Sequence, residues 1–484
     1  MMSGIAVYES LAREFGYPFT SDQERAALLL SHFVVTERER PACILRGFAG
    51  TGKTTLVGAL VRAVRQMHLP VVLLAPTGRA AKVFAAHAGE AAYTIHRYIY
   101  RQESFRGEDT RFSLDFNKLR HALFVVDEAS MIARGSTSAF SDTPFGSGEL
   151  MDDLVRFVYS GEGCRLLLVG DTAQLPPVGE EQSAALSDAF LARYGLLVGS
   201  ADLKQVLRQR SGSDVLAGAT LLRELLEQGF EGIPPLQTAG TGEVRALPAD
   251  ELVESLESDY HEFGTDNVIV VTRSNKRANI YNAGIRARIF GREEELTRGD
   301  LVMAVKNNYF WLEQLAKQLD KGERLPMPFV ANGDAAQVVR IRHVHEQYGF
   351  MFGDATLRFA DYDDFELDCR VLLSTLQSES PSLTRDESNR LFEAVMADYA
   401  HIPLKKDRLK ALRQDPYYNA VQLKYAYAVT CHKAQGGQWA RVYVDQGYIP
   451  DDATGTSYLR WLYTAFTRTT ERVYLVNWKP QPEK

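Results

Sequence analysis

The segment 47–55 constrains the fold of this chain more than any other feature. It reads GFAGTGKTT and fits the pattern Gly-x-x-x-x-Gly-Lys-[Ser/Thr], in which glycines let backbone N–H groups turn inward around phosphate oxygens. The apolar run 42–46 precedes it, and the helical segment 56–67 follows it. A phosphate-binding loop requires this place between a strand and a helix, because the start of the helix directs its positive end at the same anion.

This loop predicts a nucleotide site. Lys53 is expected to contact the β- and γ-phosphates of ATP, and the Thr54 hydroxyl is expected to hold Mg²⁺. The loop residues predicted to bind the nucleotide are Gly47, Gly50, Thr51, Gly52, Lys53, Thr54 and Thr55.

Polar residues follow two further apolar runs. Asp127 and Glu128 come directly after the run 122–126, and Gln174 lies just beyond the run 165–169. In open parallel sheets, chemistry collects beyond the carboxyl ends of the strands. We expect Asp127 to bind Mg²⁺ through water and Glu128 to act as general base on the attacking water. Gln174 is expected to position this water or to sense the γ-phosphate.

Continuous apolar runs that alternate with helical segments indicate a parallel sheet buried on both faces. A second pattern of this kind starts near residue 266, with a strand over 268–272 and a helix over 274–290. It resumes in the short apolar runs 442–445 and 473–476. The fold class is therefore α/β, with two separate parallel-sheet units.

Three segments interrupt this rhythm. Residues 98–118 contain two short alternating stretches around a Gly-Glu-Asp turn, which predicts a protruding β-hairpin. Residues 329–373 are rich in short β-like runs, and residues 382–415 are charged and helical. We expect a small β-barrel with added helices, inserted into the second α/β unit.

Composition limits the possible partners. The net charge is −7 and the pI is about 5.9, so a surface for a polyanion must be local rather than spread over the molecule. The four cysteines are far apart, which argues against a disulfide framework or a zinc site. The longest apolar runs, such as 71–75, are too short to span a bilayer, and the first 20 residues lack a signal-peptide pattern. These features predict a cytoplasmic protein without a membrane partner.

The order of the motifs resembles that of superfamily 1B helicases of the RecD-like and Dda-like type. The resemblance covers most of residues 20–478. It rests on Gln23, GFAGTGKTT (47–55), APTGRAA (75–81), TIHR (94–97), VVDEAS (125–130), VGDTAQLPPVG (169–179), LKQVLRQ (203–209), AVTCHKAQGGQW (428–439) and LYTAFTRTTERVYLV (462–476).

This resemblance implies a fold of two RecA-like P-loop domains, with a β-hairpin inserted in the first and an SH3-like barrel plus helices in the second. The implied parts are a first motor domain over 1–97 and 119–265, a strand-separating pin over 98–118, a second motor domain over 266–328 and 416–484, and a barrel with a helical insert over 329–415.

The resemblance also implies further roles at the nucleotide site. Gln23 resembles the glutamine that reads adenine, and Arg208 and Arg468 resemble two arginines that reach the γ-phosphate. Arg468 belongs to the second α/β unit, so it would reach the nucleotide only when the two units close, which couples hydrolysis to domain motion. The implied catalytic set is Lys53, Glu128, Gln174, Arg208 and Arg468.

Three blocks resemble motifs that contact the nucleic-acid strand. Hydroxyls, imidazoles and cations suit sugar–phosphate contacts, which position a strand without reading its sequence. The implied strand contacts are Thr77, Arg79, Thr94, His96, Thr430, His432 and Lys433. A core or capping histidine at position 96 and a solvated turn at 432–433 are the alternatives. In the hairpin, the aromatic rings that could stack on the last base pair are those of Phe105, Phe112 and Phe116.

Together these features predict an ATP-dependent DNA helicase that works as a monomer. From the resemblance it would move 5′→3′ on single-stranded DNA and separate tailed duplex. A translocase that displaces proteins without efficient unwinding remains open. So does a P-loop module that uses ATP only as a switch.

Overall fold

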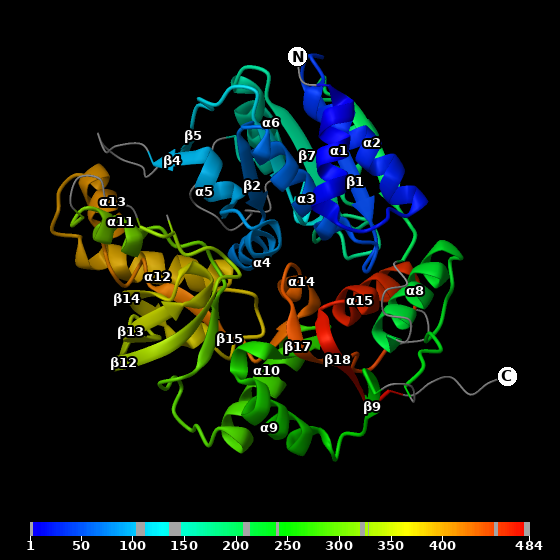
Figure 1. Cartoon of the computed structure of the whole chain (residues 1–484). Coiled ribbons are helices and arrows are strands. Elements are labelled where there is room, and N and C mark those ends of the chain that lie inside the picture. Colours follow the sequence, from blue (N-terminus) through cyan, green and yellow to red (C-terminus); the bar gives the residue numbers. More distant parts are fainter. Residues whose placement is uncertain are drawn as a thin grey trace.

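The computed structural model describes residues 3–102, 112–134, 147–206, 213–238, 242–319, 325–327, 329–449 and 454–478 (Figure 1). Two parallel β-sheets, each with its own helices, lie one above the other in Figure 1, and a closed barrel lies beside the lower one. We call the two sheets with their helices the first unit and the second unit. Within the described residues, no helix is both long and apolar enough to cross a membrane.

The sheet of the first unit is parallel throughout, with the strand order β3-β2-β6-β7-β1-β8. Its strands are β1 (Pro41–Gly47), β2 (Val71–Ala75), β3 (Ala92–Thr94), β6 (Leu123–Val126), β7 (Arg165–Gly170) and β8 (Leu197–Leu203). Its helices are α1 (Gly4–Phe15), α2 (Ser21–Val35), α3 (Lys53–Gln66), α4 (Gly78–Ala88), α5 (Ile95–Ile99), α6 (Leu150–Ser160) and α7 (Asp188–Ala192).

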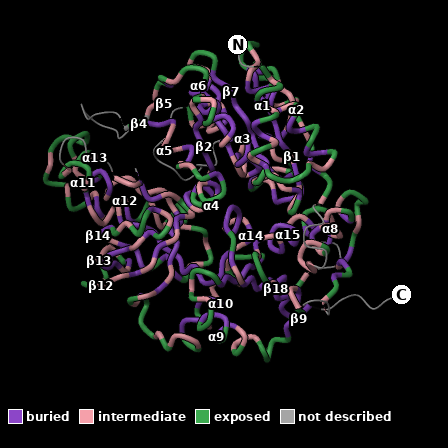
Figure 2. The backbone as a smooth tube through the Cα atoms, in the orientation of Figure 1, coloured by how far each residue is buried: buried purple, intermediate pink, exposed green. Residues whose placement is uncertain are grey.

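Alternate residues of each strand in this sheet enter different cores. Cys43 and Leu45 of β1 pack with α1 to α4, whereas Ala42 and Ile44 pack with α5 to α7. Side chains on a strand point to opposite faces, so a strand covered on both faces is apolar along its whole length. The continuous apolar runs of the sequence therefore correspond to central strands, which Figure 2 shows as buried.

The sheet of the second unit is also parallel, in the order β16-β10-β17-β18-β9. Its strands are β9 (Val244–Leu247), β10 (Val268–Thr272), β16 (Ala428–Thr430), β17 (Trp439–Asp445) and β18 (Thr469–Val476). Its helices are α8 (Asp214–Glu227), α9 (Leu252–Phe263), α10 (Asn275–Gly284), which continues as a π-helical turn over Ile285–Ile289, α14 (Cys431–Ala434) and α15 (Thr456–Phe466).

The second unit begins earlier than the sequence indicated. Strand β9 pairs with β18, and Ala219 and Leu222 of α8 lie in the same core as Leu462 of α15. The expected boundary at residue 265 is therefore wrong, and the segment from α8 onward belongs to the second unit. The reason is that β9 reads Val-Arg-Ala-Leu, with its two middle residues exposed, so it lacks the apolar run that marks a central strand.

The inserted barrel is closed and has five strands. They are β11 (Leu301–Ala304), β12 (Ala335–Gln347), β13 (Phe350–Phe359), β14 (Phe365–Leu372) and β15 (Val421–Tyr425). The expected span 329–415 is thus too short, because β11 and β15 come from segments that the sequence assigned to the second motor domain. Strands β11 and β15 are short, and each lies next to a segment of the second unit with a similar composition. The hydrophobic pattern of the sequence therefore did not separate them from that unit.

Three helices belong to this insertion: α11 (Phe310–Ala316), α12 (Arg385–Asp398) and α13 (Lys405–Arg413). The last two pack on the tip of the β12–β13 hairpin, where Phe350 and Phe352 meet Leu391, Val395 and Leu412 in a separate small core. The charged segment 382–415 is therefore a helical cap on the far end of the barrel.

The expected β-hairpin is present as a two-stranded antiparallel sheet, and its role as a pin stays a prediction. Its strands are β4 (Tyr100–Gln102) and β5 (Phe112–Leu114). The tip, which includes Phe105, lies outside the described residues. Phe116 follows β5 and is 69% exposed, so its ring is available to a partner at this end of the molecule.

Candidate nucleotide site and strand-contact residues

The phosphate loop lies between β1 and α3, as the sequence predicts. Gly50 and Gly52 have φ angles of 75° and 79°, in the left-handed region that L side chains rarely adopt. A Cβ atom at Gly50 would lie 2.2 Å from Leu216 of α8, so the loop also passes close to the second unit. The Lys53 ammonium folds back over the loop, donates to the carbonyls of Gly47 and Phe48, and lies 3.9 Å from the Asp171 carboxylate.

Gln23 joins the start of α2 to this loop. Its side chain is fully buried, and its amide nitrogen donates to the Thr51 carbonyl at 3.0 Å. Its amide oxygen accepts a hydrogen bond from the Thr20 N–H at 3.0 Å, which completes a capping box at the helix start. The structure thus places Gln23 beside the phosphate loop.

Two carboxylates stand at the end of β6. Glu128 has a φ of 50°, and its N–H donates to the Asp127 carboxylate at 2.9 Å. Burial and the neighbouring Glu128 raise the pKa of Asp127 above its usual range. A carboxylate whose charge is so poorly compensated is a good ligand for a divalent cation. With the half-buried Thr54 hydroxyl in the first turn of α3, these groups fit Mg²⁺.

Asp171 and Gln174 lie beyond the end of β7. Asp171 is 2% exposed and accepts hydrogen bonds from the Ala173 N–H at 2.9 Å and from the Tyr463 hydroxyl at 2.7 Å. Gln174 is buried, and its amide oxygen has no hydrogen-bond partner among the described residues. Sequence reasoning singled out Gln174 and missed Asp171. The signal was available, because Asp171 follows an apolar strand as Asp127 does.

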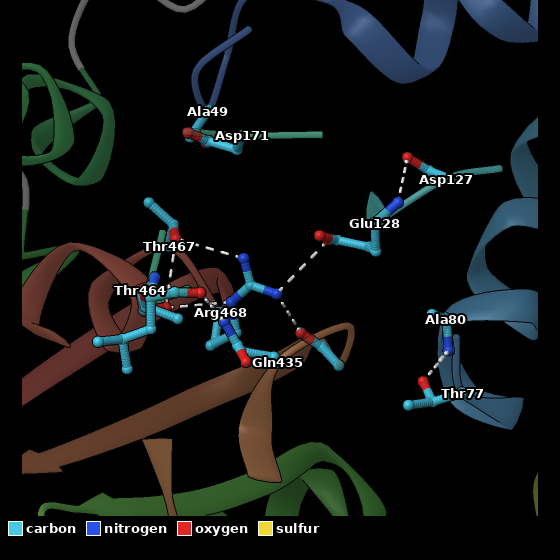
Figure 3. A network of polar contacts seen from close by, with 12 residues as sticks. Ala49, Thr77, Ala80, Asp127, Glu128, Asp171, Gln435, Thr464, Thr467 and Arg468 are labelled. Atoms are coloured by element: carbon cyan, nitrogen blue, oxygen red, sulfur yellow. Dashed lines mark hydrogen bonds and ion pairs between the residues drawn. The ribbon is translucent and has the colours of Figure 1, made fainter. Parts of the chain in front are cut away.

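Arg468 reaches from the second unit toward the first. It follows α15 and is 5% exposed, and its Nη1 atom lies 3.8 Å from Glu128 Oε1 (Figure 3). Its Nε atom donates to the Thr464 carbonyl at 3.1 Å, which holds the guanidinium in this direction. The arrangement places a cation opposite the expected general base, Glu128.

Further hydrogen bonds join the two units around this point, and sequence reasoning found none of them. The Ala49 N–H of the phosphate loop donates to the Tyr463 hydroxyl at 2.8 Å. The Leu175 N–H donates to the Thr464 hydroxyl at 2.8 Å, and the Gln435 amide donates to the Leu175 carbonyl at 2.7 Å. The available signal was that Tyr463 and Thr464 lie one helical turn before Arg468.

The second expected arginine, Arg208, lies outside the described residues, so its place in the site stays a prediction. The chain leading to it is anchored in the first unit. The Asp22 carboxylate accepts hydrogen bonds from the N–H groups of Lys204 at 2.9 Å and Gln205 at 3.0 Å.

The three threonines of the expected strand contacts all stand at helix starts. Thr77 caps α4 by accepting the Ala80 N–H at 3.2 Å, and Thr94 caps α5 by accepting the Arg97 N–H at 3.2 Å. Thr430 precedes α14 in the same way, without a side-chain cap. Each therefore marks a place where backbone N–H groups point out of a helix.

Arg79 and His96 are both covered by aromatic side chains from the second half of the chain, and their role as strand contacts stays a prediction. The Arg79 guanidinium lies 4.1 Å from the ring centre of Trp439 and donates to the Gln438 carbonyl at 2.9 Å. The His96 ring packs edge-to-face with Phe329 at 6.2 Å, and burial lowers its pKa to about 4. Both side chains therefore join the first unit to the second half of the chain.

His432 and Lys433 lie in α14 and are half-buried. Burial lowers the pKa of both side chains, and that of Lys433 falls to about 8, with a contribution from the nearby Lys424. An anionic group at this place would restore the favourable charge balance, so the environment is compatible with a phosphate contact.

Known proteins resemble this chain in parts. A model for an AAA domain matches residues 23–231, and a model for the UvrD-like helicase C-terminal domain matches residues 425–476. The ATP-dependent RecD2 DNA helicase of Deinococcus radiodurans is 34% identical over 182 residues, covering 36% of this chain and 21% of that protein. The ATP-dependent DNA helicase dda of Enterobacteria phage T4 is 24% identical over 269 residues, covering 54% of this chain and 55% of that protein.

The matches differ in extent. The conjugal transfer protein TraA of Rhizobium radiobacter is 26% identical over 63% of this chain and 24% of its own length. The chain thus spans about a quarter or less of the RecD2 helicase and of TraA. Among solved structures, the Bacteroides Pif1 helicase in complex with ADP-AlF3 and ssDNA has a TM-score of 0.45 at 16% identity, covering 95% of this chain and 92% of that one.

The fold and the site define a class. Two RecA-like parallel-sheet units, with a phosphate loop in the first and an arginine of the second that lies 3.8 Å from Glu128 of the first, form a two-domain P-loop architecture. The two domain matches and the RecD2 and Dda relatives support a superfamily 1B helicase of the RecD-like and Dda-like type.

Proposed function

We propose that this chain is an ATP-dependent DNA helicase that moves along single-stranded DNA and separates tailed duplex. The observation that carries the proposal is the position of Arg468. It belongs to the second unit, yet its Nη1 atom lies 3.8 Å from Glu128 of the first. A nucleotide between the two units would therefore be held by both, and its hydrolysis would change how tightly they close.

The chemistry follows from the groups around the loop. The loop N–H groups and Lys53 hold the phosphates. Glu128 accepts the proton of the attacking water, and Arg468 stabilises the negative charge that develops in the transition state. Thr54 and Asp127 would hold Mg²⁺, which neutralises charge on the phosphates.

The remaining expected residues complete the same site. Gln23 lies against the loop at Thr51, which supports its proposed role in reading the adenine. The buried amide oxygen of Gln174 is available to orient the attacking water once a nucleotide is bound. Arg208 supplies a second cation for the γ-phosphate, in the segment that follows the anchored end of β8.

Single-stranded DNA would lie across both units. Thr77 and Thr94 present helix starts of the first unit, and Thr430, His432 and Lys433 present one of the second. Alternating grip by the two sets, driven by closure and opening, gives directed stepping, and the pin parts the duplex as the strand passes it. The 5′→3′ direction is taken from the family. Because both sides of the ATP site come from one chain, we propose that a monomer is active.

The test measures ATP turnover with and without an oligonucleotide, and unwinding of 5′-tailed and 3′-tailed duplexes, each made with DNA and with RNA. We expect turnover to rise with single-stranded DNA and unwinding to require a 5′ tail. Stimulation without unwinding would support a translocase that displaces proteins instead. An ATP turnover rate that is the same with and without DNA would reject the proposed DNA-driven activity. Unwinding only of duplexes with a 3′ tail would mean that the protein moves 3′→5′.

A further inference from the structure

Among the helices and strands of the described residues, α13 is the most basic, although the chain as a whole is acidic. It contains five basic residues and one acidic residue, whereas the whole chain carries a net charge of −7. The exposed side chains of Lys406, Lys410 and Arg413 recur at intervals of four and three residues. This spacing places them on one face of the helix. We call these three residues the basic stripe.

The stripe is held in a fixed orientation. Leu412 of α13 is 2% exposed in the small core at the tip of the β12–β13 hairpin, and Leu409 packs against the same core. The Arg408 side chain turns back to the Ile402 carbonyl and so does not join the stripe. The apolar side of α13 is thus buried against the barrel and its basic side faces solvent, which is the arrangement of an amphipathic surface helix.

The stripe also lies on the side of the molecule that carries the pin. Figure 1 shows α13 and α11 on the same side as β4 and β5. The Gln314 side-chain amide of α11 donates to the side-chain amide oxygen of Gln414, just after α13, at 3.0 Å. Tyr309, which precedes α11, packs on Phe329 at 4.7 Å between ring centres.

Phe329 packs in turn on His96 of α5, the helix that leads directly into β4. A continuous series of contacts therefore connects the end of α13 with the base of the pin. The barrel and its cap are positioned relative to the point where strands would separate.

We propose that the basic stripe binds the phosphate backbone of the duplex ahead of the pin. This inference rests on the proposed function, and it gives the helical cap over 382–415 a role. The stripe is about 10 Å long, which corresponds to the rise of about three base pairs. Duplex DNA is the polyanion that a fixed, local row of cations matches in a chain whose overall charge repels nucleic acid.

The experiment compares two double variants of the full chain. Lys406→Gln with Lys410→Gln removes two charges from the stripe and keeps good helix-forming residues. Arg13→Gln with Arg193→Gln removes two charges from exposed positions in α1 and beyond α7, and is the matched control. Affinities for a labelled single strand and for the same strand as the 5′ tail of a duplex are measured without nucleotide over a range of salt concentrations.

We expect the stripe variant to bind tailed duplex more weakly than wild type. The slope of log affinity against log salt should become shallower by about 2, one for each lysine that contacts a phosphate. Its affinity for the single strand, its DNA-stimulated ATP turnover and its thermal unfolding should match the control. Equal effects of the two variants on tailed duplex would overturn the inference, as would an equal loss on single strand.

These outcomes separate the inference from the proposed function. If wild-type protein binds single strand and hydrolyses ATP in response, but the stripe variant behaves as the control, only the role of the stripe is rejected. If wild-type protein shows no DNA-dependent turnover, the proposed function fails, and the role of the stripe fails with it.

Discussion

The Tyr463 hydroxyl of the second unit donates a hydrogen bond to the Asp171 carboxylate of the first unit, at 2.7 Å. The same hydroxyl accepts the Ala49 N–H of the phosphate loop at 2.8 Å. One neutral group thus connects a helix of the second unit to both the loop and the buried acid beside Lys53. The Tyr463 hydroxyl thus links the position of α15 to the shape of the loop, beside the other hydrogen bonds that join the two units.

Replacement of this hydroxyl tests the connection. We expect Tyr463→Phe to lower DNA-stimulated ATP turnover about ten-fold, the rate equivalent of losing about 1.4 kcal/mol of hydrogen bonding. The control is Tyr458→Phe, in the same helix, whose hydroxyl donates only to Gln446 within the second unit. Both variants lose a buried hydroxyl, so a loss of turnover in Tyr463→Phe alone assigns the effect to the contact between units. Equal turnover in the two variants contradicts it.

Arg468→Ala should retain nucleotide binding and lose turnover by about 10³-fold, because an arginine that reaches across the cleft acts mainly on the transition state. Binding of a fluorescent nucleotide and steady-state turnover are the two measurements. Arg472→Ala provides the control, since that side chain lies over the Tyr474 ring within β18. Wild-type turnover in Arg468→Ala would mean that the catalytic cation is supplied elsewhere.

Lys53→Ala should abolish hydrolysis while the fold stays intact. Among the described residues, the ammonium contacts only two loop carbonyls and lies 3.9 Å from the Asp171 carboxylate, so its removal leaves the core unchanged. Thermal unfolding should therefore match that of Lys276→Ala, a change at an exposed ion pair with Glu379. Chelation of Mg²⁺ should stop the wild-type reaction. Persistent turnover in Lys53→Ala would reject the phosphate loop as the active site.

A stability prediction concerns the buried ion pair at the root of the barrel. Asp300 is fully buried and accepts two hydrogen bonds from Arg286, at 3.0 and 2.9 Å, and one from Arg292 at 2.8 Å. Burial alone would raise the pKa of Asp300, but Arg286 and the other donors hold it below 3.8. Asp300→Asn should lower the free energy of unfolding at pH 7 by about 3–5 kcal/mol, since it leaves buried arginines uncompensated.

The lowered pKa of Asp300 decides how the free energy of unfolding changes with pH. Because the pKa of Asp300 is lower in the folded state, its stabilising contribution is complete above about pH 5 and is lost as the pH falls through the folded-state pKa. Urea unfolding from pH 7 to pH 3 should therefore bring wild type and Asp300→Asn together at the acidic end. Glu162→Gln, at an exposed pair with Arg120, should change the free energy of unfolding by under about 1 kcal/mol. A constant difference between wild type and Asp300→Asn down to pH 3 would contradict the assignment.

Most of the fold was predictable wherever a strand is buried on both faces. The runs at 42–46, 122–126 and 268–272 became central strands because sheets covered on both sides need apolar residues throughout. Strands β9 and β11 were missed or misplaced, since an edge strand and a barrel strand of four residues carry no such run. Their place is decided by pairing partners far away in the sequence.

The site divides in a similar way. The positions of Lys53, Asp127 and Glu128 at the ends of strands were predictable because each belongs to a local motif that follows a strand. Tyr463 was not, because its role arises from contacts with residues nearly 300 and more than 400 positions away, as the separations of 292 and 414 residues show. For Arg79 the local motif was present, but the Trp439 ring that covers its guanidinium belongs to the other unit.

The first and last strands of the barrel lie side by side, with Val302 opposite Tyr425 and Met303 opposite Lys424. The chain therefore leaves the second unit and returns to it at adjacent points, after an excursion of more than a hundred residues. Such a junction is tolerant of grafting, because a loop that starts and ends at one place can be lengthened or exchanged without pulling on its base. An inserted domain of different size or fold could therefore join the second unit through the same pair of adjacent strands.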